Sequence, residues 1–457
     1  MERIKTDICI IGAGSGGLSV AAGAVQMGAR VVLIEGHKMG GDCLNYGCVP
    51  SKALLAAGKM VPKPDFGTAK DHVQRVIDTI APVDSQERFE GLGVKVIRAH
   101  ARFISKTEVQ AGDTVITARR FVLATGSAPF VPPIPGIDDV AVHTNETIFD
   151  LRNQPKHLLI IGGGPIGMEM AQAHLRLGCK VTVIEAATAM GKDDPDHAAI
   201  LLDRLRGEGI QIVEAAKAER ISGIDGDITV HTSKGDFSGS HLLMAVGRKV
   251  NVDGLDLELG GIAHDSKGIK VGPDLRSVSN KRVYAIGDAA GGAQFTHVAG
   301  YHAGVIIRSM LFALPAKQRT DHIPWATFTD PEVAQVGLTE TQARQRYGAA
   351  LQVVGAAFAH NDRAIAETKT TGRIKVMVVK GRPVGASIIG TQAGELIGLW
   401  AMAIANRLKM TAIAKTVLPY PTLSEVNKRA AGAYFSPRLF DSPVVKTVVG
   451  LVQRFIP

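Results

Sequence analysis

Two cysteines, Cys43 and Cys48, stand close together in the stretch GGDCLNYGCVPSK, and Lys52 follows the second. Their spacing suits a redox-active disulfide, half of a metal site, or two thiols that are neighbours by chance. In a regular helix the Cα atoms of such a pair lie roughly 8.5 Å apart, whereas a disulfide needs less than about 7 Å. Gly47 and Pro50 favour an irregular turn instead, which would allow the sulfurs to meet.

A static metal site is the weaker interpretation of this pair. The spacing differs from that of a zinc knuckle, and no second Cys/His pair at ligand spacing accompanies it. Cys9 lies within an apolar strand and Cys179 just before another, so both are expected to be small core residues. A redox pair is therefore favoured, with a metal site and chance as the alternatives, and we expect no resident metal.

Two near-copies of a glycine fingerprint would position this chemistry. Each has an apolar strand, the pattern G-x-G-x-x-G and an alanine-rich helix. A second strand then ends in an acid, Glu35 or Glu185, each 23 residues after its first glycine. Such a turn places a diphosphate at a helix N-terminus, and the acid accepts hydrogen bonds from a ribose hydroxyl. Two dinucleotide sites are predicted, with the glycines Gly12, Gly14, Gly17, Gly162, Gly164 and Gly167.

Further strand-and-turn signals extend this repeat. FVLATGS (121–127) and LLMAVGR (242–248) are both apolar strands that end in a glycine turn. RVYAIGDAA (282–290) is a third such signal, and the small residues after Asp288 are expected to start a helix. Strands and long helices without a fingerprint follow from residue 323, including a helix over 394–407. The sequence thus predicts an α/β protein with two Rossmann-like domains and a C-terminal α+β domain.

Composition excludes several other classes of protein. The chain has 457 residues, 46% of them hydrophobic and only 5% aromatic, with 51 glycines, as is typical of an α/β protein of several domains. The net charge of +9 is not gathered in a dense basic block, so we expect it to help hold anionic cofactors and not nucleic acid. No signal-peptide pattern and no apolar run of about 18 residues are present, which favours a cytoplasmic location.

The order of these motifs, with YPTLSE (420–425) near the C-terminus, resembles that of the flavin-dependent pyridine nucleotide–disulfide oxidoreductases. This family includes dihydrolipoamide dehydrogenase, glutathione reductase and mercuric reductase. The resemblance covers residues 6–435 and implies a homodimer. The implied domains are an FAD-binding domain (1–147 and 276–322), an NAD(P)-binding domain (148–275) and a C-terminal dimer-interface domain (323–457).

The resemblance also implies roles for single residues. Electrons would pass from NADH through FAD to a Cys43–Cys48 disulfide, with Cys48 facing the flavin and Cys43 facing the substrate. Lys52 would pair with Glu169 beside the flavin. No arginine closely follows Glu185, so NADH is expected in preference to NADPH. The implied cofactor-binding residues are the six fingerprint glycines, Glu35, Lys52, Thr125, Gly126, Glu185, Gly247 and Asp288.

The C-terminal motif departs from the pattern of the lipoamide and glutathione reductases. Those enzymes carry HPTxxE, whose His serves the outer thiol from the partner subunit, whereas this chain has Tyr420 in that position and Glu425 at the end of the motif. A phenol titrates near 10 and an imidazole near 6.5, so Tyr420 is expected to donate a hydrogen bond or touch a soft metal instead of shuttling protons. His297 and His302 are candidate replacement bases, although a surface or core role is expected for both.

The predicted function is that of an FAD-dependent NAD(P)H oxidoreductase that acts on a small disulfide, a thiol-reactive compound or a soft metal ion. A tyrosine at position 420 of the motif resembles the pattern of mercuric reductase. However, no cysteine follows Cys179, so the terminal cysteine pair of that enzyme is missing. Mercuric reductase proper is one alternative, and an NADH:quinone-type reductase that does not use the disulfide is another. Residues 443–456 predict an amphipathic helix that docks on its own domain, with weak membrane-surface contact as a second hypothesis.

Overall fold

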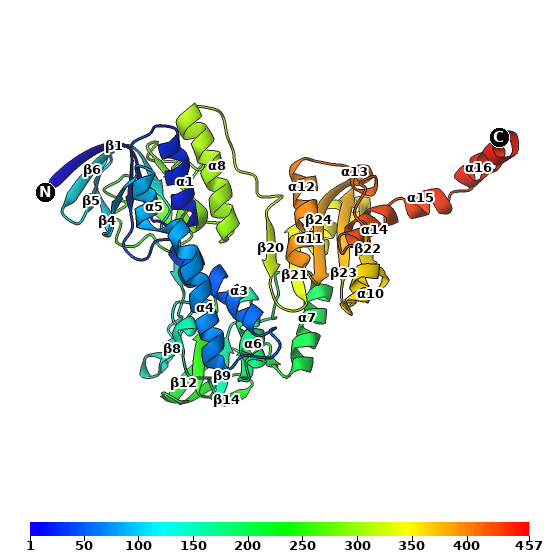
Figure 1. The fold of residues 1–457 in the computed structure, drawn as a ribbon, viewed down its shortest axis with the longest axis horizontal. Coiled ribbons are helices and arrows are strands. Elements are labelled where there is room, and N and C mark those ends of the chain that lie inside the picture. The colour runs from blue at the N-terminus through cyan, green and yellow to red at the C-terminus, as the bar shows by residue number, and fades with distance from the viewer. Residues whose placement is uncertain (457) are drawn as a thin grey trace. The chain divides into compact units, whose positions relative to one another are not determined.

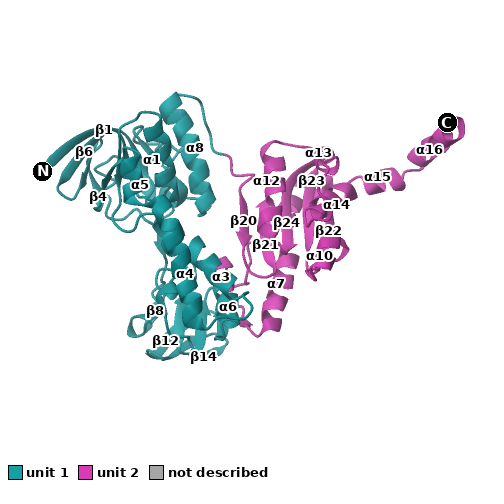
Figure 2. Ribbon diagram, viewed as in Figure 1, with its two compact units in different colours: residues 1–163, 170–186, 215–318 teal, residues 164–169, 187–214, 319–457 magenta. Residues whose placement is uncertain are grey.

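The computed structural model describes residues 1–456. The chain forms two compact units, shown in different colours in Figure 2. Unit 1 comprises residues 1–163, 170–186 and 215–318, and unit 2 comprises residues 164–169, 187–214 and 319 onward.

The first sheet of unit 1 contains the strand before the first fingerprint. Its strands, in spatial order, are β3 (Lys95–Ile97), β2 (Val31–Ile34), β1 (Glu2–Ile11), β6 (Thr114–Leu123), β5 (Glu108–Ala111) and β4 (Ala101–Ser105), and β19 (Val283–Ala285) also pairs with β6. β4 and β5 are antiparallel to their neighbours, and the other pairs are parallel. Helices α1 (Ser15–Gln26) and α8 (Thr296–Phe312) lie side by side (Figure 1) and bury Leu18, Val20 and Ile306 in one core cluster.

A second parallel sheet repeats this plan around the second fingerprint. In unit 1 its strands lie in the order β10 (Lys180–Ile184), β9 (His157–Ile161), β15 (His241–Met244) and β8 (Val142–His143). Helix α6 (Pro165–Arg176) follows β9 as α1 follows β1. The antiparallel strands β12 (Ala218–Ile224), β13 (Asp227–Thr232) and β14 (Gly235–Gly239) form a separate small sheet.

The two glycine turns that the sequence showed as repeats lie against each other. They continue into β7 (Ser127–Pro129) and β16 (Arg248–Val250), which pair antiparallel. Asn251 N donates to Gly126 O at 3.0 Å, and Thr125 Oγ1 donates to Asn251 O at 2.7 Å. This pairing joins the ends of two sheets. A short hairpin, β17 (His264–Asp265) and β18 (Gly268–Ile269), completes the strands of unit 1.

The segment after β2 is an insertion made mainly of helices. They are α2 (Gly41–Asn45), α3 (Cys48–Ala57), α4 (Phe66–Ile80) and α5 (Gln86–Gly91). α3 and α4 pack together and bury Leu54, Phe66 and Val73. Both cysteines of the predicted redox pair belong to this insertion.

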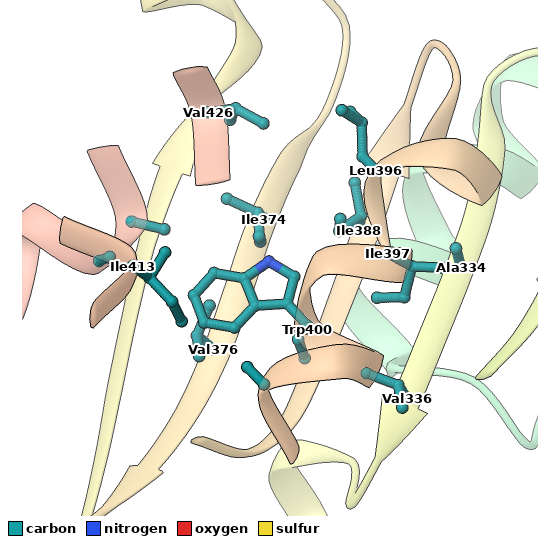
Figure 3. Close-up of a cluster of buried hydrophobic side chains, with 14 of the residues drawn as sticks. Ala334, Val336, Ile374, Val376, Ile388, Leu396, Ile397, Trp400, Ile413 and Val426 are labelled. Atoms are coloured by element: carbon teal, nitrogen blue, oxygen red, sulfur yellow. The ribbon is translucent and has the colours of Figure 1, made fainter. Parts of the chain in front are cut away.

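Unit 2 is built on an antiparallel sheet with a core around Trp400. Its strands, in spatial order, are β20 (Pro324–Thr327), β21 (Glu332–Gly337), β24 (Arg382–Gly390), β23 (Arg373–Val379) and β22 (Leu351–Ala357). The Trp400 ring lies among Ile374, Val376 and Ile413 (Figure 3), and its Nε1 donates to Asn427 Oδ1 at 2.8 Å. The helices and remaining strand of unit 2 are α7 (Pro195–Glu208), β11 (Gln211–Val213), α9 (Glu340–Tyr347), α10 (Asp362–Ala366), α11 (Ala393–Leu396), α12 (Gly398–Ala405), α13 (Met410–Ala414) and α14 (Glu425–Ala433).

Two helix predictions were wrong in detail. The single helix expected over 394–407 is divided into α11 and α12, with the break at Ile397. The segment at Asp288 forms only a 3-10 turn (Gly287–Ala290), because Gly291 and Gly292 follow with positive φ and end it; α8 starts later, at Thr296.

The C-terminal tail contains the amphipathic helix that the sequence predicted. α15 (Ser436–Phe440) leads to α16 (Pro443–Phe455), and Figure 2 shows both extending away from the sheet of unit 2. The apolar side chains of α16 are exposed, apart from the half-buried Val445, and the helix is not docked on the described part of the chain, contrary to the first expectation. None of the described helices is long and apolar enough to cross a membrane.

Candidate active site

The first fingerprint forms a close backbone turn between β1 and α1. A Cβ atom on Gly12 would lie 2.3 Å from Ala124 O, and one on Gly17 would lie 1.9 Å from Gly12 O. The N-cap of α1 is Gly14, with no side-chain cap and no acidic residue in the first turn. The N-terminal N–H groups of α1 therefore suit a diphosphate, as FAD binding requires.

Each acid that follows a fingerprint holds the turn of its own copy. Ala13 N donates to Glu35 Oε2 at 2.6 Å, and His37 N donates to Glu35 Oε1 at 2.7 Å. In the second copy Gly163 N donates to Glu185 Oε2 at 2.7 Å. In each copy the acid thus holds the backbone N–H of the residue between the first two glycines. The motif predicted only a contact between the acid and a ribose.

The second fingerprint repeats the tight contact of the first. A Cβ on Gly162 would lie 2.4 Å from Ala245 O, the residue that corresponds to Ala124 in the first copy. Gly164 directly precedes α6, and Gly167 lies in the first turn of that helix. Gly247 has a φ of 144°, which favours glycine. Within unit 1, the tight turn at Gly162 and the positive φ of Gly247 are consistent with the predicted second fingerprint.

The cysteine-bearing loop is attached to the first turn. Gly40 N donates to Ala13 O at 3.0 Å, and Gly14 and Gly40 form a parallel bridge. A Cβ on Gly41 would lie 2.7 Å from Gly14 Cα, so only glycine allows this approach. The loop therefore starts at the turn that suits the FAD diphosphate.

Cys43 and Cys48 meet across a break between two helices. α2 ends at Asn45 and α3 begins at Cys48, so the irregular turn that the sequence predicted lies at Tyr46 and Gly47. The pKa of the Cys43 thiol is raised, first by its hydrogen bond with Cys48 and then by burial. The hydrogen bond shows that the two side chains are close enough to interact directly.

Thr296 is a residue of this site that the sequence analysis missed. Its Oγ1 lies 3.5 Å from Cys48 Sγ, and a hydrogen bond from Thr296 lowers the pKa of the Cys43 thiol. Thr296 is the first residue of α8, which packs against α1. No sequence pattern singled out Thr296, and only the three-dimensional packing shows that it reaches the cysteines.

Asp42 and three distant residues make a second missed cluster. Asn145 Nδ2 donates to Asp42 Oδ1 at 2.9 Å, and Arg248 Nη2 lies 3.2 Å from the same oxygen. Arg248 Nε donates to Ser127 Oγ at 2.7 Å. Ser127 Oγ in turn donates to Asp288 Oδ2 at 2.6 Å. Burial raises the pKa of Asp288, and the Ser127 hydrogen bond opposes that shift.

The other expected residues of the relay are divided between the units. Lys52 is half-buried in α3, and its Nζ donates to Ser51 Oγ at 3.4 Å. Glu169 is buried in unit 2, where its Oε1 accepts from Phe328 N at 2.9 Å. Since Lys52 belongs to unit 1, its pairing with Glu169 stays a prediction.

The C-terminal motif is held within unit 2. Tyr420 is exposed and its hydroxyl donates to Asp362 Oδ2 at 2.7 Å, which raises the pKa of the phenol. Glu425 begins α14, and its Oε2 has no hydrogen-bond partner among the described residues. Tyr420 is therefore oriented by Asp362.

The two candidate histidines differ in environment. His302 is buried, accepts from Gly287 N at 3.1 Å through Nδ1, and has its pKa lowered by burial. It is a core residue, as expected. His297 is exposed and stacks on Phe295 at 5.2 Å between ring centroids. Among the described residues no group of three or more His, Cys, Asp and Glu side chains is arranged to hold a metal ion.

Comparison with known proteins identifies the family. Residues 6–303 match the pyridine nucleotide-disulphide oxidoreductase family, and residues 323–431 match the dimerisation domain of that family. The chain belongs to the pyridine nucleotide-disulphide oxidoreductases. Membership brings FAD and a pyridine nucleotide as cofactors and electron transfer from nicotinamide through flavin to a disulfide, and the second match supports a homodimer.

Members of the family resemble the whole chain. A mercuric reductase from Bacillus cereus is 33% identical over 452 residues, which cover 93% of this chain and 70% of the relative. A dihydrolipoyl dehydrogenase from Bacillus subtilis is 30% identical over 444 residues, 92% of this chain and 96% of the relative. The Cu(II) complex of the HOCl-induced flavoprotein disulfide reductase RclA from Escherichia coli has a TM-score of 0.87 and 29% identity, and covers 94% of this chain and 99% of that chain.

Proposed function

We propose that this oxidoreductase carries electrons from NADH to a small thiol-reactive oxidant through the Cys43–Cys48 pair. The observation that carries the proposal is the attachment of the cysteine loop to the first fingerprint, through Gly40 N to Ala13 O at 3.0 Å. That attachment supports a position of the thiols close to the turn that would hold FAD. Bound FAD supplies hydride acceptance from the nicotinamide and two-electron transfer to a disulfide.

The cysteines would divide the remaining chemistry between them. NADH and one proton reduce the disulfide to two thiols. The Cys43 thiolate then attacks one sulfur of a substrate disulfide, forms a mixed disulfide and expels the first substrate thiolate. Cys48 attacks the Cys43 sulfur, closes the protein disulfide and releases the second thiolate. Thr296, with Oγ1 3.5 Å from Cys48 Sγ, is placed to stabilise the Cys48 thiolate by a hydrogen bond.

In the single chain the exposure of the two thiols is the reverse of the proposed order. Cys43 is half-buried and Cys48 is exposed. The proposed order places Cys48 against the flavin and Cys43 toward the substrate, because FAD and a second subunit would each cover part of this surface. Alkylation of the reduced holoenzyme tests the order, since the outer thiol reacts first with iodoacetamide.

Soft metal ions are the second class of oxidant that we propose. The relatives named mercuric reductase and the Cu(II) complex of RclA support this choice. One Hg(II) ion, or two Cu(II) ions reduced to Cu(I), would take up the two electrons. The exposed Tyr420 phenol, with a raised pKa, stays protonated at neutral pH; because its one O–H is donated to Asp362, its oxygen would touch such a metal ion.

NADH is the proposed electron donor. The Glu185 carboxylate is fixed by Gly163 N at 2.7 Å, so it cannot readily turn away from a ribose 2′-phosphate. Lys192 is the first cation after it in the sequence. Repulsion of the 2′-phosphate without a compensating arginine disfavours NADPH.

A substrate panel tests the proposed function. NADH consumption by the holoenzyme is followed with lipoamide, glutathione disulfide, Hg(II), Cu(II), quinones and reactive electrophiles. We expect turnover with at least one thiol-reactive oxidant, and its loss in Cys43→Ser. Cys179→Ser is the matched control, because this thiol is buried away from solvent. Turnover restricted to quinones and unchanged in Cys43→Ser would establish the quinone reductase alternative instead.

We also propose that the C-terminal tail contacts an anionic membrane surface. Val448, Val452 and Phe455 lie on one side of α16 and are exposed. Lys446 and Arg454 lie on the other side, and the helix contains no acidic residue. A basic helix of this kind lies in the plane of the interface, with its apolar side among the acyl chains.

Vesicle binding tests this contact. The purified dimer should co-sediment with phosphatidylglycerol-containing vesicles and not with pure phosphatidylcholine vesicles. Val448→Glu with Val452→Glu should abolish binding, whereas Thr447→Glu with Gln453→Glu changes the charge equally on the polar side and should weaken it less. The proposal is overturned if both double variants lose vesicle binding equally, or if the unchanged protein does not bind vesicles. A tail that packs on the second subunit would leave the unchanged protein unable to bind.

A further inference from the structure

Arg248 is a half-buried cation joined to the segment that contains the cysteines. Its side chain is 14% exposed, and Nη2 lies 3.2 Å from Asp42 Oδ1. Nε and Nη2 also donate to Ser127 Oγ and Ser127 O, each at 2.7 Å. The guanidinium is therefore held by strand β7 on one side and contacts the cysteine loop on the other.

Asp42 is the residue through which this cation reaches the loop. It stands next to Cys43, and its backbone carbonyl accepts from Tyr46 N at 2.8 Å. Asn145 Nδ2 donates both to Asp42 Oδ1 at 2.9 Å and to Tyr46 O at 3.2 Å. A Cβ on Gly47 would lie 2.9 Å from Asp42 Oδ2. Asp42 is thus linked to the backbone between the two cysteines, directly through its own carbonyl and indirectly through Asn145.

The carboxylate also carries a charge that opposes the chemistry. The negative charge of Asp42 is one of the causes that raise the pKa of the Cys43 thiol. A carboxylate beside a developing thiolate disfavours it unless a cation compensates. Arg248 supplies that cation and the planar donor geometry that a carboxylate accepts.

We propose that Arg248 is a positioning residue of the thiol relay, which acts through Asp42 to hold the Cys43–Cys48 turn and to cancel the carboxylate charge beside Cys43. The proposal rests on the proposed function, because it assigns Arg248 a part in thiol chemistry. No contact between Arg248 and the substrate is required.

The test uses the reduced holoenzyme without any oxidant, so it does not depend on which substrate the protein uses. The two readouts are the rate of Cys43 alkylation by iodoacetamide, followed by peptide mass spectrometry, and the long-wavelength absorbance expected from the Cys48 thiolate against oxidised flavin. Arg248→Met should slow Cys43 alkylation about tenfold and weaken the absorbance, since an opposite charge nearby shifts a pKa by about one unit. Arg248→Lys should recover part of both, because it restores the charge but not the several N–H groups with which the guanidinium contacts Ser127 and Asp42.

Variants of Asp42 separate this role from a general loss of stability. Asp42→Asn should alkylate at least as fast as the unchanged protein, and Arg248→Met should have little further effect in that background, as expected for two residues that act as a unit. An equal effect of Arg248→Met in both backgrounds overturns the proposal, as does unchanged alkylation in Arg248→Met. Lys249→Met is the control: it removes an exposed cation paired with Asp253 from the same strand and should change neither readout.

Failure of this inference is distinguishable from failure of the proposed function. If Cys43→Ser retains turnover across the substrate panel, the thiol relay itself is wrong. If Cys43→Ser abolishes turnover while Arg248→Met leaves alkylation and absorbance unchanged, the relay stands and the role of Arg248 is wrong.

Discussion

Thr296 Oγ1 lies 3.5 Å from Cys48 Sγ, although 248 residues separate them in the chain. The contact exists because α8 begins at Thr296 and packs against α1, the helix that follows the first fingerprint. A helix from the end of unit 1 thereby supplies a hydroxyl to a thiol pair in the insertion near its beginning.

Loss of this hydroxyl should make the thiols harder to ionise. Thr296 lowers the pKa of the Cys43 thiol by a hydrogen bond, so Thr296→Val removes that stabilisation and raises the pKa. The acid limb of the activity–pH profile should move to higher pH, and turnover at neutral pH should fall about tenfold, the size expected for a hydrogen bond to a charged group. Thr296→Ser keeps the hydroxyl and should behave as the unchanged enzyme; a pH profile that does not move in Thr296→Val contradicts this role.

Glu185 should decide between NADH and NADPH. Glu185→Gln removes the charge but keeps an oxygen that can accept from Gly163 N, so the turn is preserved. The ratio of kcat/KM for NADH to that for NADPH should fall about tenfold or more, because the 2′-phosphate is no longer repelled and a charged acceptor for the ribose is lost. Glu214→Gln serves as a control, because Glu214 also accepts a hydrogen bond from a backbone N–H, that of Ala189, and pairs with Arg206. A wild-type ratio that favours NADPH would show that the proposed preference is wrong.

The local parts of the site could be predicted from the sequence. The turn at Gly12, the approach of Cys43 to Cys48 and the break near Gly47 depend on glycine, proline and spacing, which a short window contains. The contacts of Thr296, Asn145 and Arg248 depend on which strands and helices become neighbours, and no local pattern records that. Asp42 was inside the quoted motif, yet its importance comes from a cation that lies more than 200 residues away in the chain.

The fold shows the same division between local and long-range information. The strand–turn–helix repeats predicted two Rossmann-like sheets, and the family match confirms that fold class. The pairing of β7 with β16 was not predicted, because each strand is only three residues long and apolar periodicity cannot be read from so few positions. The domain boundaries stay a prediction.

Tyr420 should not act as a proton-transferring base. Its hydrogen bond to Asp362 raises the pKa of the phenol above 10.0, so it stays protonated through the neutral range. Tyr420→Phe should therefore leave the limbs of the activity–pH profile between about pH 6 and 9 where they are, while it changes KM for the oxidant. Tyr420→His should add a new limb near pH 6.5, the ordinary value of imidazole. A limb that disappears in Tyr420→Phe would show that the phenol does transfer protons.

The buried charge of Lys70 should lower the stability of the folded protein at neutral pH. Its side chain is 2% exposed, Nζ donates to Ile148 O at 2.8 Å, and burial lowers its pKa from 10.5 to about 8. Below pH 8 both the folded and the unfolded chain hold the proton, and the folded state carries the full cost of the buried charge. Between about 8 and 10.5 the unfolded chain binds more protons, so the contribution of Lys70 to stability improves as pH rises.

Lys70→Met should therefore stabilise the protein most at neutral pH. Removal of the buried charge gains about 3 kcal/mol for a shift of this size, and the unpaired Ile148 carbonyl costs about 1 kcal/mol, which leaves about 2 kcal/mol. The difference in Tm between variant and unchanged holoenzyme should be positive at neutral pH and shrink as pH approaches 10. Arg75→Met, which removes an exposed cation from the same helix, should give no such trend. A Lys70→Met protein that melts lower than the unchanged one at neutral pH would show that the hydrogen bond to Ile148 outweighs the cost of burying the charge.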